Sequence, residues 1–108
     1  MANGIIPMKF AIKFEKDHAS VKVSYDLRVP VGGPALIADF QVSVEGVDLI
    51  SNFVPGQTRF NGAKFHKLAH PEEDADVSFS MSSNEGWTAS DHDTLRGNHA
   101  YDDADFAN

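Results

Sequence analysis

Strict alternation of apolar and polar residues most constrains what this chain can fold into. In residues 7–15, Phe10, Ile12 and Phe14 alternate with polar or small residues, and residues 21–29 repeat the pattern. Successive side chains of a β-strand point to opposite faces, so this period predicts strands with one buried and one solvated face. The polar residues 16–20 between the two segments predict that they form a hairpin.

The alternation continues with interruptions as far as residue 81. Residues 36–45 predict a strand whose inward side chains are Leu36, Ala38, Phe40, Val42 and Val44. Residues 47–54 and 77–81 predict two more. The pair Asn61-Gly62 favours a two-residue type I′ turn between two short strand arms. The alternative for the second arm is a short helix over residues 63–70, ended by Pro71. From Ser82 onward the alternation disappears.

About seven short strands and no amphipathic helix predict an all-β fold, an antiparallel β-sandwich of immunoglobulin-like type. A small closed barrel is the alternative. With 108 residues the chain is long enough for one domain. We expect residues 1–81 to form the sandwich core. We expect residues 82–108 to be an irregular, acidic segment punctuated by aromatic residues, either part of the same domain or a flexible tail.

Charge is distributed unevenly and excludes some classes of partner. The net charge is −7: residues 1–70 hold eight basic and six acidic side chains, whereas residues 71–108 hold one basic and ten acidic side chains. Nucleic-acid binding and attraction to anionic membranes both need clustered Lys and Arg, so neither is expected. The chain contains no cysteine, and residues 1–7 do not resemble a signal peptide. These features favour a soluble, cytoplasmic protein, with secretion as the alternative.

Five aspartates in the last eighteen residues make the first candidate site. Calcium takes six to eight oxygen ligands, so closely spaced carboxylates are suitable chemistry for it. The candidate ligands are Asp91, Asp93, Asp102, Asp103 and Asp105. Their spacing does not match the helix–loop–helix calcium motif. The zinc alternative would use His92 with His99, or His66 with His70, and neither pair has a recognised ligand template. We expect no bound organic cofactor.

Aromatic residues within the same segment predict contact with a protein partner. Trp87, Tyr101 and Phe106 interrupt the acidic run and would serve as apolar anchors beside the carboxylates. A carbohydrate-binding alternative would use Trp87 as a stacking platform, with Asn84 and Glu85 fixing sugar hydroxyls. The structural alternative is that Trp87 closes one end of the core.

A basic stripe on the first hairpin would complement the acidic segment. Lys9, Lys13, Lys22 and Arg28 share the outward face if the predicted register is right. The acidic segment would dock there within one molecule or in a neighbouring copy, and head-to-tail docking would produce a ring or a filament.

The sequence shows no catalytic motif: no serine lies in a Gly-x-Ser-x-Gly elbow, and Asp91-His92-Asp93 has no fixed geometry. We therefore expect a non-catalytic protein-binding or assembly module of adaptor, inhibitor, immunity or virion-accessory type. A calcium-dependent or aromatic-platform carbohydrate-binding module is the alternative, and a small hydrolase ranks third.

Overall fold

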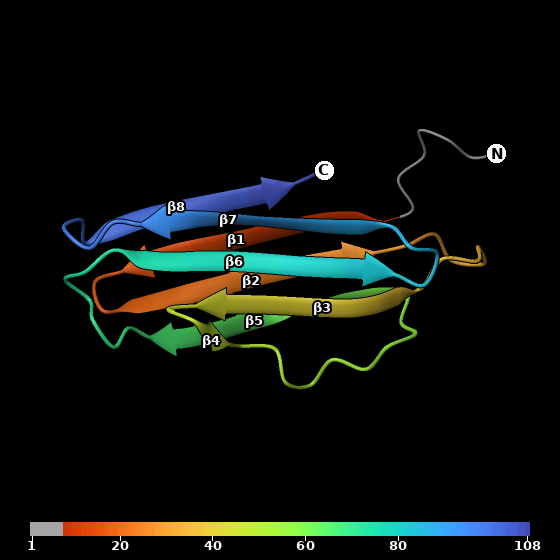
Figure 1. Cartoon of the computed structure of the whole chain (residues 1–108), viewed down its shortest axis with the longest axis horizontal. Coiled ribbons are helices and arrows are strands. Elements are labelled where there is room, and N and C mark those ends of the chain that lie inside the picture. The colour runs from red at the N-terminus through yellow and green to blue at the C-terminus, as the bar shows by residue number, and fades with distance from the viewer. Residues whose placement is uncertain (1–7) are drawn as a thin grey trace.

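The computed structural model describes residues 8–108, and it is a β-sandwich of eight strands in two four-stranded antiparallel sheets (Figure 1). Residues 1–7, and with them the start of the first predicted strand and the signal-peptide prediction, lie outside the described residues. The first sheet has the order β5-β2-β1-β8: β5 (Arg59–Lys67), β2 (Ser20–Arg28), β1 (Lys9–Asp17) and β8 (Tyr101–Ala107). The second has the order β4-β3-β6-β7: β4 (Val47–Asp48), β3 (Ile37–Val44), β6 (Ala75–Ser83) and β7 (Thr88–Leu95). The predicted fold class is confirmed.

No stretch of residues 8–108 forms a helix of the length and hydropathy that a bilayer crossing requires.

The inner faces of the two sheets form one apolar core, as the alternation predicts. Strands β1 and β2 make the expected hairpin through a two-residue turn at His18 and Ala19, with Asp17 opposite Ser20. The largest fully buried side chains are contributed by β1, β2 and β3 and by the residue that precedes β1: Phe14, Phe40, Met8, Ile12, Leu27 and Ile37. Fully burying each of these stabilises the fold by about 1.5–3 kcal/mol relative to exposure.

A β-bulge at the start of β3 changes the predicted inward set. The register between β3 and β6 shifts between Ile37 and Asp39. The extra residue reverses the alternation on its N-terminal side. Ala35 and Ile37 are therefore buried, in place of the predicted Leu36 and Ala38.

The predicted turn at Asn61-Gly62 is wrong, and so is the alternative helix over residues 63–70. Strand β5 runs without interruption past both residues, which lie opposite Asp26 and Tyr25 of β2. Gly62 is required for another reason: a Cβ atom there would lie 2.9 Å from the Tyr25 hydroxyl oxygen. The absent side chain gives the Tyr25 ring room to stack on Phe60, with ring centroids 5.4 Å apart.

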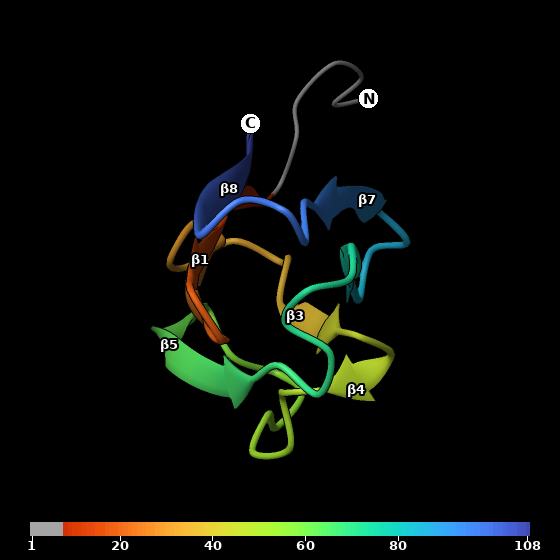
Figure 2. The same cartoon turned by 90° about the vertical axis from the view of Figure 1, so that its left-hand side faces the viewer.

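The segment 82–108 is not irregular, which corrects the prediction for the end of the chain. It contains β7 and β8, and each forms the border of a sheet (Figure 2). Strand β7 pairs with β6 and β8 pairs with β1, both antiparallel. The boundary expected at residue 81 therefore does not separate the sandwich from a tail, because β8 is a full member of the first sheet.

A buried lysine fastens the connection between these two strands. Lys16 is 4% exposed, and its ammonium group donates to the carbonyl oxygens of Pro71, Arg96 and Gly97 at 3.2, 2.8 and 3.4 Å. A buried charge needs such partners to offset lost hydration. Lys16 thereby holds the β7–β8 connection against the end of β1.

Candidate partner-binding edges

Strands β7 and β8 bring the five predicted aspartates to one side of the sandwich (Figure 2). Neither strand contains a lysine or an arginine. The predicted acidic surface therefore exists, but as two sheet borders rather than a loop.

Three of these aspartates bind the backbone of their own strands. In an antiparallel pair every second residue directs its N–H and C=O groups away from the partner strand. Asp91 accepts from the outward N–H of His92, and Asp93 from that of Thr94, both at 2.8 Å. On β8, Asp102 accepts from the N–H of Asp103 at 2.9 Å. Unpaired N–H groups at a sheet border invite another strand to pair, and these carboxylates occupy three of them.

Asp102 also orders the loop that leads into β8. Its second carboxylate oxygen accepts from the backbone N–H of Arg96 at 2.9 Å. That hydrogen bond is the largest influence on the Asp102 carboxyl and, with the N–H of Asp103, lowers its pKa against the opposing effect of partial burial. Asp102 is thus ionised at neutral pH and has a structural role.

Asp103 and Asp105 have no such role, since among residues 8–108 no hydrogen bond or ion pair engages their carboxylates. Both are exposed on the outer face of the first sheet, opposite Glu15 and Lys13 of β1. Tyr101 lies on the same face of β8 and is 67% exposed, with its ring edge-on to His18 at 5.1 Å. These three side chains form an acidic row with one aromatic ring, here called the β8 row.

The other two predicted anchors belong to the fold. Phe106 packs against Phe14 of β1 and Phe79 of β6, with ring centroids 6.0 and 5.1 Å away, and so bridges the two sheets. Trp87 is half-buried, with its ring centroid 6.4 Å from that of Phe10. Asn84, the suggested sugar ligand, instead fixes residues 34–36 through two hydrogen bonds. Only Tyr101 of the three aromatic residues stands free to meet a partner.

The side chains suggested for zinc or calcium binding do not gather at one point within residues 8–108. No three His, Asp or Glu side chains in that range come together as a group that could hold a metal ion. His66 instead bonds Glu45 at 2.8 Å, and His70 lies 3.6 Å from Glu73. On β7, His92 points to the opposite face from Asp91 and Asp93, because neighbouring strand residues alternate. The Asp-His-Asp triplet therefore does not converge on one point.

The sequence interpretation missed the opposite border of the first sheet, strand β5. It carries Arg59, Lys64 and Lys67 and no acidic residue. Its outward N–H groups belong to odd-numbered residues, because the bonds Val29 N–H to Thr58 and Leu68 N–H to Ala19 set the pairing phase. Within the described residues no side chain or backbone carbonyl accepts from these N–H groups. Beside them stands Phe65, 73% exposed.

The basic stripe predicted on the first hairpin is interrupted by acids. Arg28 donates to Asp26 at 2.8 Å, and Arg59 of β5 lies 3.3 Å from the same carboxylate. Burial raises the pKa of Asp26, but the hydrogen bonds from Arg28 and Arg59 outweigh it and leave that pKa below its ordinary value. Arg59 therefore shares the single Asp26 carboxylate with Arg28, whereas no ion pair within residues 8–108 involves Lys67.

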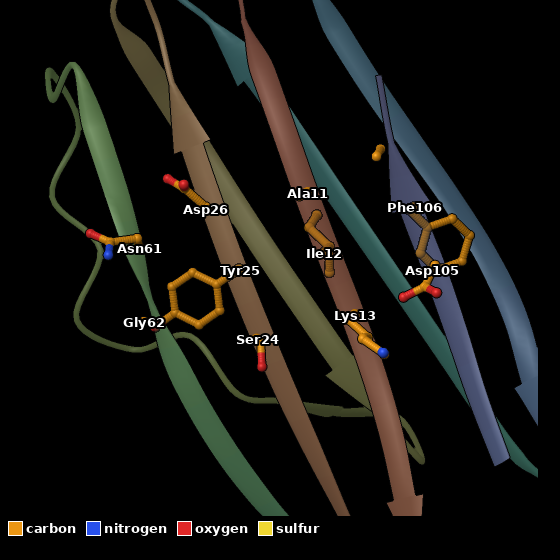
Figure 3. A pocket seen from close by; sticks show the side chains of 11 residues that line it. Ala11, Ile12, Lys13, Ser24, Tyr25, Asp26, Asn61, Gly62, Asp105 and Phe106 are labelled. Atoms are coloured by element: carbon orange, nitrogen blue, oxygen red, sulfur yellow. The ribbon is translucent and has the colours of Figure 1, made fainter.

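The outer face of the first sheet also holds a shallow depression of about 460 Å³, shown in Figure 3. Small side chains and Gly62 lower its floor, and all four strands contribute to it. Its polar groups come from Lys13, Ser24, Asp26, Asn61 and Asp105. Asp105 of the β8 row lies at its margin, next to Lys13.

Comparison with protein families, curated proteins and solved structures gave no match to this chain.

Proposed function

We propose that this chain is a non-catalytic protein-binding or assembly module that contacts its partner through the β8 row. The observation that carries the proposal is the contrast among the five aspartates. Asp91, Asp93 and Asp102 bond backbone N–H groups, whereas Asp103 and Asp105 stand exposed beside Tyr101 without a structural task. An exposed aromatic ring flanked by charges is a common composition for the centre and rim of a protein interface.

The negative charge of the β8 row determines which kind of partner surface can bind it. Two carboxylates in line on a flat sheet face attract a surface with lysine or arginine at matching spacing. Complementary charge accelerates encounter and discriminates between partners, and it loses strength when salt screens it over about 10 Å at 0.1 M. The partner surface is therefore basic, with an apolar contact for the ring.

The test compares three baits that differ only in the position of two charges. The first is the unaltered chain, and the second carries Asp103→Asn with Asp105→Asn. The control carries Asp39→Asn with Asp48→Asn, which removes two exposed carboxylates from the second sheet. Proteins retained at low salt from the cells that produce the chain are identified, purified and titrated against all three by calorimetry.

We expect a purified partner to bind the unaltered chain and the control equally, and the Asp103/Asp105 variant at least tenfold more weakly. Raising the salt concentration from about 50 to about 500 mM should weaken binding of the unaltered chain and of the Asp39/Asp48 control. Equal binding of all three versions, or no protein bound by any of them, would show the proposal to be wrong.

Carbohydrate binding is the second candidate, and the depression on the first sheet is the observation that favours it. Carboxylate, amide and ammonium groups at its margin could bind the hydroxyls of a sugar. The aromatic residues that line it are Tyr25 and Phe106, and both lie at its floor rather than standing out as a stacking platform. Titration with a panel of oligosaccharides, followed in amide spectra, tests it. Shifts confined to residues around Asn61, and lost in Asn61→Ala, would support this candidate.

A further inference from the structure

The two borders of the first sheet complement each other in charge, aromatic content and direction. Strand β5 carries three basic residues and no acid, and β8 carries three aspartates and no base. Phe65 and Tyr101 are exposed on the outer faces of β5 and β8 respectively. Figure 2 shows the two strands at opposite borders of the sheet.

Building on the proposed function, we propose that the partner of β8 is a second copy of this chain. Its β5 border receives β8 as a neighbouring strand and extends the first sheet from molecule to molecule.

Strand direction makes this pairing geometrically simple. In a sheet of four antiparallel strands the first and last run in opposite directions, so β8 of one copy meets β5 of the next antiparallel. The outward residues of both strands are odd-numbered and have their side chains on the outer face. Pairing odd with odd therefore keeps the apolar and polar faces of the two sheets aligned.

Cross-strand neighbours are favourable over the last part of β5. If the row of residues that crosses the sheet at Lys67, Ser20, Asp17 and Tyr101 continues into the next copy, Tyr101 meets Lys67 of that copy and Asp103 meets Phe65. Asp103 is then diagonal to Lys67, within reach of a long side chain. The Asp103 N–H exchanges its bond to Asp102 for one to a carbonyl of β5.

Charge disfavours the competing arrangement in which two β5 borders pair with each other. An antiparallel β5–β5 pair centred on Ala63 sets Arg59 of each copy opposite Lys67 of the other. Like charges directly opposite each other destabilise a strand pair. On β7 the side chains of Asp91 and Asp93 occupy two outward N–H groups, whereas on β8 Asp102 occupies the one at Asp103.

The experiment uses the full chain and two charge reversals that should block opposite borders. Lys67→Glu reverses the charge at the β5 position that would face Tyr101 and Asp103, and Asp103→Lys reverses one of the two charges of the β8 row. Both residues are exposed, and circular dichroism with thermal melting confirms that each variant folds. Lys9→Glu is the matched control, because Lys9 lies on the same sheet face but on a central strand. Phe65→Ser is a second β5 variant without a charge change.

Sedimentation velocity at low and high salt measures the outcome. We expect the unaltered chain and Lys9→Glu to associate at low salt. Lys67→Glu, Asp103→Lys and Phe65→Ser should each associate at least tenfold more weakly. An equimolar mixture of Lys67→Glu and Asp103→Lys should assemble again, since each restores the charge match that the other lost. The amides of Ala63 and Phe65 should gain hydrogen-exchange protection in the assembled protein.

Several results would overturn the pairing. An unaltered chain that stays monomeric at low salt and millimolar concentration would do so. So would association that Lys67→Glu leaves unchanged, or a mixture that fails to assemble. A monomer that still binds another protein through Asp103 and Asp105 would refute this inference alone and leave the proposed function intact.

Discussion

Replacing Glu45 by asparagine tests which of two opposing effects dominates at the β3–β4 turn. Glu45 and Gly46 form a two-residue turn between Val44 and Val47, and both have positive φ, 53° and 76°. Asparagine adopts this conformation more readily than glutamate, so the turn alone predicts that Glu45→Asn is stabilising by up to about 1 kcal/mol.

The side chain of Glu45 predicts the opposite result. The Glu45 side chain is 13% exposed. Its carboxylate accepts hydrogen bonds from His66 Nε2 at 2.8 Å, from Ala69 N–H at 2.7 Å and from His70 N–H at 3.1 Å. These bonds join the turn of the second sheet to the end of β5 in the first. A bond to a charged acceptor contributes about 1.5–3 kcal/mol, and because three bonds that share one carboxylate are not additive, we expect a total of about 2–4 kcal/mol.

The difference between the two effects gives a net destabilisation of about 1–3 kcal/mol for Glu45→Asn, since asparagine is too short to reach the same donors. For a domain of this size that lowers Tm by roughly 4–15 °C. Urea unfolding followed by Trp87 fluorescence measures it. A variant as stable as the unaltered chain, or more stable, would show that turn conformation outweighs the three hydrogen bonds.

The pH dependence provides a second measurement on the same residue. Burial raises the pKa of Glu45, but the hydrogen bonds from His66 and from the N–H groups of Ala69 and His70 outweigh it and lower the pKa below its ordinary value. The fold therefore stabilises the ionised form, and this contribution is complete at neutral pH and lost as the pH falls through the lowered pKa. We expect the stability difference between the unaltered chain and Glu45→Gln to shrink on acidification below about pH 4.5. A difference that does not change with pH would contradict this account.

Four other substitutions and one addition test the fold and the site, each by urea or thermal unfolding unless stated. Gly62→Ala should lower the free energy of unfolding by about 1–3 kcal/mol, because the added methyl group displaces the Tyr25 ring. Its control, Asn61→Ala at an exposed position, should change the free energy of unfolding by less than about 0.5 kcal/mol. A larger effect at Asn61 than at Gly62 would favour a turn at these residues. Phe106→Ala should cost about 2–4 kcal/mol by opening the contact between the sheets, and a neutral effect would return this ring to the set of partner anchors. Lys16→Met should lower the free energy of unfolding by about 2–3 kcal/mol, since three carbonyl groups lose the hydrogen bond from the Lys16 ammonium group. An unchanged unfolding midpoint would mean that water replaces the ammonium group. Millimolar calcium should leave Tm and the amide spectrum of the acidic strands unchanged; a clear shift would show that the aspartates rearrange around an ion.

The central strands could be predicted from sequence because each has two different environments. Strands β1, β2, β3 and β6 have a neighbour on both sides and pack one face on the core, so their apolar residues recur at every second position. The bulge at Ile37 could not be predicted, because it depends on how β3 pairs with β6. The prediction of a turn at Asn61-Gly62 failed for a similar reason: the ring that requires a glycine at position 62 belongs to Tyr25, which is far away in the sequence.

Strands β7 and β8 were missed because acidic residues stand among their inward side chains. Strand β7 directs Asp91 and Asp93 inward along the same face as Leu95, and it has no regular apolar alternation to detect. The acidic composition of residues 82–108 was visible in the sequence, and the candidate surface proposed here lies within that segment. The sequence could not show which aspartates bond the backbone and which stay exposed, because this depends on the N–H groups that strand pairing leaves outward.

The strongest argument for the proposed assembly is that the four sheet borders differ in how their outward backbone groups are covered. Beyond β4, the chain itself covers the border of β3, with Ile37 bonded to Gly56 and Gln57. Carboxylates occupy outward N–H groups on β7 and β8. Strand β5 has nine residues, and its only visible protection against indiscriminate pairing is positive charge. Lysine at a border repels another basic border but attracts an acidic one. Under the proposed pairing, the β5 border therefore excludes another β5 border and accepts the acidic β8 of a second copy.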